Sequence, residues 1–305
     1  MSRDIPSKLI QTIDCKQGAV RAVRFNADGT YCLTCGSNKT IKLWNPHRDL
    51  LLKSYQGHGY EVLDAQAGCD NSQICSGGMD KTVRLFDVAT GKALRTFRGH
   101  AGTVNCVKFN EESTVILSGA IDSTIRAWDT RSRKNEPVQV MDEAKDSVTS
   151  IQVSDHEILS GSADNHVRRY DLRIGRMMAD YIGKPVTSVT FTRDGQCILV
   201  SSLDDTLRLI DKDTGELLNE YKGHKNSEYK IDGCLNSKDT HILTGSENGL
   251  VCIWDLVDAN MVEKLDHSTM RAIHSLSYHP SDTCLLTASG DKFYVWKSKY
   301  APSGD

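Results

Sequence analysis

Residues 99–129, GHAGTVNCVKFNEESTVILSGAIDSTIRAWD, constrain the fold of this chain more than any other feature. The stretch opens with Gly-His, closes with Trp-Asp, and places Ser118 and Asp122 between them. Six further copies, some degenerate, align with it, and the seven copies close at Trp44, Phe86, Trp128, Tyr170, Ile210, Trp254 and Trp296. The spacings are 42, 42, 42, 40, 44 and 42 residues. This period and these marks are typical of four-stranded propeller blades. The sequence therefore predicts an all-β, seven-bladed β-propeller with four antiparallel strands per blade.

The ends of the chain predict how the ring closes. Residues 8–14 resemble the end of a repeat rather than its beginning, and only nine residues follow Trp296. We therefore expect this N-terminal segment to supply the outer strand of blade seven, which removes the open edge of a linear array. The predicted limits are a tail at 1–7, a propeller at 8–300 and a tail at 301–305. Within the propeller, the outer strand of blade seven is 8–14, and blades one to seven follow at 15–56, 57–98, 99–140, 141–181, 182–222, 223–266 and 267–300.

Composition narrows the possible functions. A formal net charge of −3 gives no basic field, so we expect no direct binding of nucleic acid. No uncharged apolar run approaches membrane-spanning length, and the N-terminus lacks the apolar core of a signal peptide. Ten cysteines without a secretory signal predict reduced, mostly buried thiols in an intracellular protein.

Four residues of the reference repeat could be mistaken for a catalytic constellation. His100, Ser118 and Asp122 have the residue types of a hydrolase triad, and Trp128 lies nearby in the repeat. In a blade, these positions can form a chain of hydrogen bonds from indole to hydroxyl to imidazole to carboxylate. A catalytic group is not expected to recur in every blade, so we interpret the set as a structural network. The candidates at the same positions elsewhere are His58, Ser76, Asp80, His224, Thr244 and Trp254.

Other motifs predict no chemistry. Cys32 and Cys35 form one isolated Cys-x-x-Cys, whose thiols would point to opposite faces of a strand and complete no zinc site. The sequence contains no glycine-rich phosphate loop and no His-Glu-x-x-His motif. We expect no enzyme activity, no metal and no cofactor.

One face of the predicted disc carries a candidate surface for partner proteins. In three blades the position directly before the tight-turn aspartate, where exposure would favour a polar side chain, holds an apolar residue. These residues are Met79, Ile121 and Leu203. Such a mixture of apolar, aromatic and charged groups is typical of protein-binding patches, although these side chains could instead pack against neighbouring loops. The full candidate rim is Arg21, Tyr60, Glu61, Met79, Asn105, Ile121, Leu203, Tyr229, Lys230 and Glu247.

Two neighbouring blades share a second mark. Arg131 and Arg173 each lie two residues after the aspartate that closes a repeat, on the opposite face of the disc. The pattern resembles the Trp-Asp-x-Arg signature of propellers that dock onto the adaptor of a cullin-type ubiquitin ligase as substrate receptors. The alternative is an arginine that pairs with a carboxylate in its own hairpin.

The chain as a whole, over about residues 8–300, resembles the WD40-repeat family. Four stretches resemble more specifically the mitogen-activated protein kinase organizers, a group of WD-repeat scaffolds; they are 17–37, 57–65, 153–173 and 195–230. This resemblance implies a non-catalytic scaffold, a monomer within larger complexes, that assembles kinase-cascade components. It also implies association with the spliceosome in pre-mRNA splicing, contact with a prolyl hydroxylase of the hypoxia response, and a cytoplasmic and nuclear location. The ubiquitin-ligase receptor remains the alternative function, and direct RNA binding is disfavoured by the overall charge.

Overall fold

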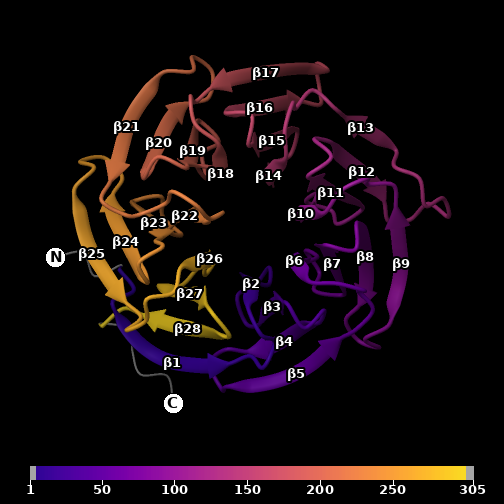
Figure 1. Cartoon of the computed structure of the whole chain (residues 1–305), viewed down its shortest axis with the longest axis horizontal. Helices are drawn as coiled ribbons and strands as arrows, with labels where there is room; N and C mark the ends of the chain where they lie inside the picture. Colours follow the sequence, from indigo (N-terminus) through magenta and orange to yellow (C-terminus); the bar gives the residue numbers. More distant parts are fainter. Residues whose placement is uncertain (1–4, 300–305) are drawn as a thin grey trace.

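The computed structural model describes residues 5–299 and forms a ring of seven four-stranded antiparallel sheets (Figure 1). All 28 elements assigned in these residues are strands. The predicted seven-bladed all-β propeller is confirmed. Figure 1 shows one strand of each blade beside the central channel and another at the rim.

Each blade is an up-and-down meander in which sequence neighbours pair. Blade one contains β2 (Val20–Phe25), β3 (Cys32–Gly36), β4 (Ile41–Asn45) and β5 (Leu50–Tyr55). Blade two contains β6 (Val62–Ala67), β7 (Gln73–Gly78), β8 (Thr82–Asp87) and β9 (Ala93–Arg98). Blade three contains β10 (Val104–Phe109), β11 (Val115–Ala120), β12 (Ile125–Asp129) and β13 (Gln139–Met141).

The other four blades repeat this order. Blade four contains β14 (Val148–Val153), β15 (Glu157–Ser162), β16 (His166–Asp171) and β17 (Arg176–Tyr181). Blade five contains β18 (Val186–Phe191), β19 (Cys197–Ser202), β20 (Thr206–Asp211) and β21 (Leu217–Lys222). Blade six contains β22 (Gly233–Leu235), β23 (His241–Gly245), β24 (Leu250–Asp255) and β25 (Met261–Asp266). Blade seven contains β26 (Ile273–Tyr278), β27 (Cys284–Ser289), β28 (Lys292–Lys297) and the N-terminal β1 (Lys8–Asp14).

The predicted ring closure is confirmed. Strand β1 pairs antiparallel with β28, from Lys8 opposite Lys297 to Asp14 opposite Lys292. Ile13 of this strand is only 1% exposed and belongs to the apolar cluster between blades seven and one. The first and last strands of the propeller therefore share one sheet, and blade seven has the same four strands as the other six blades.

The core lies between blades because the second strand of each blade is covered on both faces. Every residue of Cys32–Gly36 in β3 is buried. Cys32 packs into the cluster with Phe25 and Trp44, whereas Cys35 packs into the cluster with Tyr55. The two thiols thus face opposite sides of the strand, as the alternation of side chains in a strand requires.

Neighbouring blades are also joined by hydrogen bonds beside the channel. Side chains of one inner strand accept backbone N–H groups of the next: Asp64 from Val107, Gln66 from Phe109, Ser150 from Val189, Ser188 from Gly233, Ser275 from Val23 and Ser277 from Phe25. These bonds satisfy amide groups that no sheet neighbour reaches.

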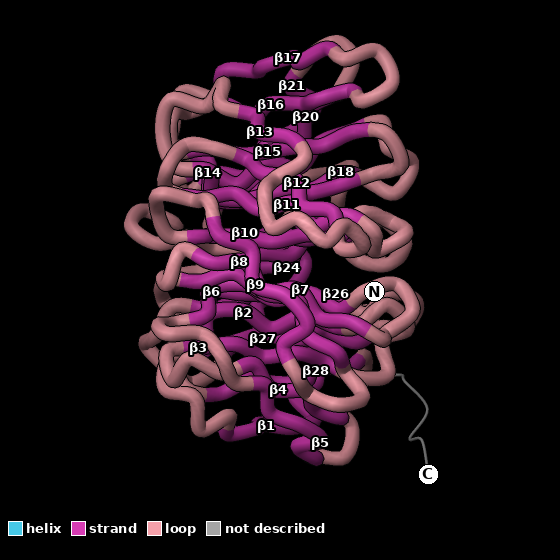
Figure 2. Tube along the Cα trace, turned by 90° about the vertical axis from the view of Figure 1, so that its right-hand side faces the viewer, coloured by secondary structure: helices cyan, strands magenta, loops and turns pink. Residues whose placement is uncertain are grey.

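Loops gather at the two faces of the disc, with the strands between them (Figure 2). The upper face carries the connections between blades and the turns between second and third strands, such as 99–103 and 121–124. The lower face carries the other connections, such as 130–138 and 172–175. Among residues 5–299 there is no helix long and apolar enough to cross a membrane.

Candidate functional site

The four candidate residues of blade three form one chain of hydrogen bonds. Trp128 Nε1 donates to Ser118 Oγ at 2.8 Å, and Ser118 Oγ lies 2.7 Å from His100 Nε2. His100 Nδ1 lies 3.0 Å from Asp122 Oδ2. Because the carboxylate only accepts hydrogen bonds, Nδ1 carries the proton, and Nε2 accepts the serine hydroxyl. The serine is thus fixed between two partners.

Electrostatics support a structural role for this chain. Burial lowers the pKa of His100 despite the facing carboxylate, so the ring is neutral near pH 7. The pKa of Asp122 lies below its usual value. Burial acts to raise this pKa, but the hydrogen bond from Thr124 and the nearby His100 outweigh burial. The same carboxylate accepts the backbone N–H of Ala101 at 2.7 Å. The network therefore joins an upper loop, a turn and the third strand.

Other blades repeat the network with different residue types. In blade two, His58 lies 2.9 Å from Asp80 and 2.8 Å from Ser76. Two further versions escaped the sequence analysis: Trp44 donates to Thr34 and Thr34 to Gln17 in blade one, while Trp296 and His267 both bond Thr287 in blade seven. The usual Gly-His mark is missing in both blades: glutamine replaces histidine in blade one, and no glycine precedes the histidine in blade seven. The pairing of Trp with Thr is the signal that could have identified these two networks.

The network predicted for blade six is wrong. Neither ring nitrogen of His224 has a hydrogen-bond partner within residues 5–299. Thr244 donates to the carbonyl of Asp232 at 3.0 Å, and Trp254 donates to the carbonyl of Lys222 at 3.2 Å. The position that holds aspartate in blade three is the exposed Asn248, so no carboxylate orients the imidazole. The long loop 223–232 also brings its own backbone to Thr244.

Four of the candidate rim residues on the upper face are large apolar or aromatic side chains exposed to solvent. Tyr60 is 63% exposed, Met79 42%, Ile121 53% and Tyr229 47%. They occupy separate loops of blades two, three and six, around the mouth of the channel. The ammonium of Lys39 lies 5.6 Å from the centre of the Tyr60 ring. Such side chains offer contact area at low entropic cost, because their loops are anchored to a rigid scaffold.

Three further rim candidates are less available than the sequence suggests. Leu203 is only partly exposed. The Glu247 side chain is 6% exposed, because its carboxylate accepts backbone N–H groups of Ser227, Glu228 and Tyr229 at 2.7, 2.6 and 3.2 Å. Asn105 donates to Ser147 and to the carbonyl of Val148. These residues shape the rim rather than present free side chains.

The remaining rim residues build the channel mouth. Lys230 Nζ donates to the carbonyl oxygen of Asn105 at 3.1 Å, and the Tyr229 ring packs edge-on against His274. Arg21 and Glu61 form an ion pair at 2.9 Å between blades one and two. Loop 225–232 of blade six therefore lies across the mouth toward blade three.

One exposed residue of the upper face was missed altogether. Met270, in the loop before β26, is 91% exposed. Blade seven is shorter at its tight turn, and its histidine lacks the usual preceding glycine, so the alignment gave this loop no reference point.

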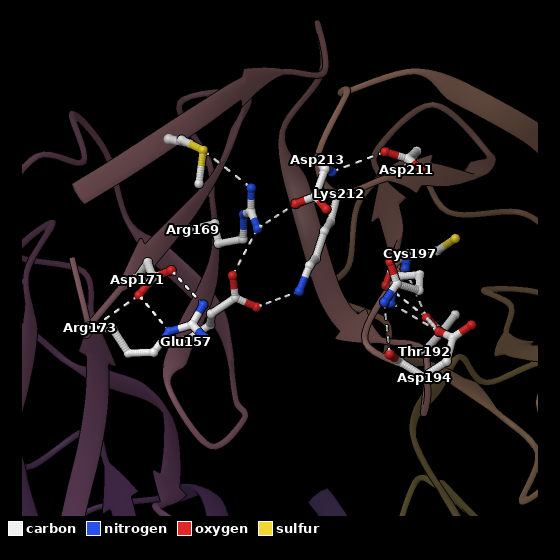
Figure 3. A network of polar contacts seen from close by, with 12 residues as sticks. Glu157, Arg169, Asp171, Arg173, Thr192, Asp194, Cys197, Asp211, Lys212 and Asp213 are labelled. Carbon is white, nitrogen blue, oxygen red and sulfur yellow. Dashed lines mark hydrogen bonds and ion pairs between the residues drawn. The ribbon is translucent and has the colours of Figure 1, made fainter. Parts of the chain in front are cut away.

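The two candidate docking arginines lie on the lower face, as expected from their position after the third strand. Arg173 pairs with Asp171 at 3.1 Å and lowers the pKa of that carboxyl to about 2 (Figure 3). Arg131 is exposed, and its loop is held by the Arg95 guanidinium, which donates to the carbonyls of Asp129, Thr130, Ser132 and Lys134. One arginine thus has a carboxylate partner in its own hairpin and the other projects to solvent.

A possible metal-ligand cluster on the same face is already neutralised. Donor atoms of His156, Glu157 and Asp171 lie within 4.8 Å of one another. Glu157 pairs with Arg169 at 2.8 Å and with Lys212 at 2.9 Å, and Asp171 pairs with Arg173 (Figure 3). A divalent cation would have to displace these cations, so the cluster acts as a charge network between blades four and five.

Comparison with known proteins agrees with the geometry. The family model described as WD domain, G-beta repeat matches residues 7–45 and 215–255, and the model described as Nucleolar protein 10-like, N-terminal domain matches 64–233. The chain is 67% identical to human "WD repeat domain-containing protein 83" over 296 residues, covering 97% of this chain and 94% of the relative. The chain belongs to the WD repeat domain-containing protein 83 family.

The similarity extends to distant organisms. The zebrafish (Danio rerio) protein of that name is 64% identical over 292 residues, covering 96% of this chain and 92% of the relative. The homolog from Dictyostelium discoideum is 35% identical over 303 residues, covering 90% of this chain and 93% of the relative. The whole propeller, and not an isolated repeat, is therefore shared within this family.

Proposed function

We propose that this propeller is a non-catalytic scaffold that captures partner proteins on its upper face. The observation that carries the proposal is the exposure of Tyr60, Met79, Ile121 and Tyr229 on rigidly anchored loops of one face. The constellation that most resembles a catalytic triad is engaged in holding a blade together, which favours a binding role over an enzymatic one. Membership of a family of WD40 propellers supports the same conclusion.

The resemblance to kinase-organizing scaffolds suggests which complexes this face serves. We propose components of a mitogen-activated protein kinase cascade, including the ERK pathway, and proteins of the pre-mRNA splicing machinery as partners. A prolyl hydroxylase of the hypoxia response is a further proposed partner. With these partners, we propose a cytoplasmic and nuclear location and a splicing association that rests on protein contacts rather than on contacts with RNA.

A double substitution on the upper face and a single control substitution on the lower face test the scaffold proposal. Met79→Asp with Ile121→Asp places two charges in the exposed patch, where they should abolish partner capture while leaving the melting curve nearly unchanged. Val257, on the lower face, is 79% exposed, so Val257→Asp is the matched control and should leave capture intact. Equal capture by wild type and the double variant in pull-downs with purified kinase-cascade components would reject the upper face as the binding surface.

The second candidate function is that of a substrate receptor for a cullin-type ubiquitin ligase. The exposed guanidinium of Arg131, on a loop fixed by Arg95, favours it, whereas the pairing of Arg173 with Asp171 argues for a local role of that residue. Pull-down of the ligase adaptor, and its loss on Arg131→Ala with Arg173→Ala, would support this function. Absence of adaptor binding by the wild type would exclude it.

A further inference from the structure

The side chains that line the central channel include one more arginine or lysine than carboxylates. A cavity of about 390 Å³ fills the channel and reaches the lower face, and its lining includes four arginine or lysine side chains, one histidine and three carboxylates. The arginines and lysines are Arg24, Lys108, Arg193 and Lys230, the histidine is His279, and the acidic residues are Asp64, Asp232 and Asp239.

One arginine forms ion pairs with both carboxylates at the centre of the channel, those of Asp64 and Asp232. Arg24 lies 2.8 Å from Asp232 and 3.2 Å from Asp64, and so joins blades one, two and six. Burial alone raises the pKa of Asp232, but the charge of Arg24 holds it below its usual value. At the lower mouth, Asp239 accepts the backbone N–H of Arg193, while the Arg193 guanidinium donates to the carbonyls of Ser237 and Pro280.

Lys108 remains without a partner. It is the fifth residue of inner strand β10, at the level of Arg24 in β2, and makes no hydrogen bond or ion pair with any residue of 5–299. Lys230, by contrast, donates to the Asn105 carbonyl at the upper mouth. Burial lowers the pKa of Lys108, with the Arg24 charge acting in the same direction and the more distant carboxylates opposing it. The ammonium is only partly exposed and is attracted by Asp64 and Asp232 without bonding to either, so no direct partner among residues 5–299 offsets its desolvation.

The rest of the wall offers hydrogen-bond donors. The hydroxyl oxygens of Ser150, Ser188 and Ser277 each accept a backbone N–H of the next blade. Their hydroxyl protons have no acceptor among the described residues 5–299, so they are available to a ligand. The amide of Gln152 and the hydroxyl of Thr190 line the same cavity at the fifth position of their strands. One surplus positive charge and a wall of free donors match a small anion.

We propose that the central channel is a binding site for a small phosphate-type anion, with the Lys108 ammonium as its counter-charge and the channel hydroxyl groups as its donors. The anion enters from the lower face, because loop 225–232 and the ion pair of Arg24 with Asp232 restrict the upper mouth. Free phosphate and a phosphomonoester share the chemistry that this wall recognises. The site is independent of the scaffold surface on the upper face.

Calorimetric titration of the full chain tests this site, with inorganic phosphate and phosphoserine as separate titrants in phosphate-free buffer at constant ionic strength. The wild type should bind one anion per chain, and Lys108→Met should weaken binding roughly tenfold or more, in line with the loss of a charged hydrogen bond. Lys92→Met removes an exposed lysine from a lower loop and should bind as the wild type does. Tighter binding of phosphoserine would identify a phosphomonoester site, and tighter binding of phosphate an inorganic one.

Two measurements guard against misfolding as an explanation. Without anion, Lys108→Met should melt at or above the wild-type temperature, since the variant removes a partly buried ammonium that has no direct hydrogen-bond or ion-pair partner among residues 5–299. Gln152→Leu keeps the charge and removes a donor, so it should bind more weakly than wild type. No binding of either anion by the wild type, equal affinity in Lys108→Met, or a strongly lowered melting temperature of that variant would each overturn the proposal.

Discussion

The Lys230 ammonium reaches across the upper channel mouth to the carbonyl oxygen of Asn105, 3.1 Å away. These residues belong to blades six and three, so the contact spans the ring rather than joining neighbours. The loop that carries Lys230 also presents Tyr229, one of the four exposed side chains proposed to capture partners. The upper surface is therefore organised by contacts from blade to blade and from loop to loop.

Glu247 should control the order of this loop. Its carboxylate accepts three consecutive backbone N–H groups, so Glu247→Ala removes all three bonds at once. Hydrogen exchange of the Ser227, Glu228 and Tyr229 amides should become roughly tenfold faster or more. Loss of these bonds lowers the free energy required to open the loop for exchange by about 1.4 kcal/mol or more. Glu228→Ala, on the exposed side of the same loop, should leave the exchange rates unchanged, and equal rates in all three proteins would show that the carboxylate does not hold the loop.

Histidines at the same repeat position should differ sharply in their contribution to stability. His100→Phe removes one hydrogen-bond partner each from the Ser118 hydroxyl and the Asp122 carboxylate and should cost about 2–4 kcal/mol of unfolding free energy. His224→Phe removes a ring with no polar partner within residues 5–299 and keeps the edge-on packing against Trp254, 5.6 Å between ring centres. This variant should be neutral or stabilising in urea unfolding, and equal losses in both variants would contradict the assignment.

Stability should fall on mild acidification. Burial lowers the pKa of His224 and of His267 to about 4, whereas an unfolded histidine titrates near 6.5. Above about pH 6.5 both states are neutral. Between about pH 6.5 and pH 4, these histidines bind protons in the unfolded chain but not in the folded chain. Each of the two rings therefore lowers the free energy of unfolding by about 3 kcal/mol across this pH range.

His224→Phe tests this pH dependence directly. Its unfolding free energy should fall less steeply than that of the wild type between pH 6.5 and 4, and the two slopes should agree above pH 7. Identical slopes throughout would mean that His224 is protonated in the folded chain.

Ring closure should contribute strongly to thermal stability. Deleting residues 1–14 removes β1 and exposes the strand β28 and the apolar cluster around Phe293. We expect a sharply lowered melting temperature. The milder Ile13→Ala, at a position 1% exposed, should cost about 2–4 kcal/mol. Ile10→Ala, where the side chain is 49% exposed, is the matched control, and an unchanged melt of the deletion variant would show that the ring does not depend on this strand.

The repeat period was sufficient to predict the fold, because blade geometry depends on strand spacing and turn residues that recur along the chain. The rim could be predicted only in part. Met79 and Ile121 precede turns whose geometry directs them to solvent, whereas Glu247 at the same position folds inward onto a loop whose path no repeat specifies. The network predicted around His224 was wrong for a related reason. Asn248 stands where blade three has an aspartate, so blade six lacks the carboxylate that orients the histidine ring.

The channel site was not predictable from the sequence. Lys108, Arg24 and Asp232 are far apart in the chain, and each occupies an unremarkable inner-strand or loop position. Only closure of the ring shows that Arg24 pairs with both central carboxylates and that Lys108 does not.

Crosslinking mass spectrometry of the full chain with its bound partners tests the central claim most directly, because it identifies the contacted face without any substitution. Exposed lysines mark both faces: Lys39, Lys81 and Lys225 lie on upper loops, and Lys92 and Lys134 on lower loops. If the upper rim is the binding surface, partner crosslinks should concentrate at the first three lysines. Crosslinks concentrated at Lys92 and Lys134 would contradict the account.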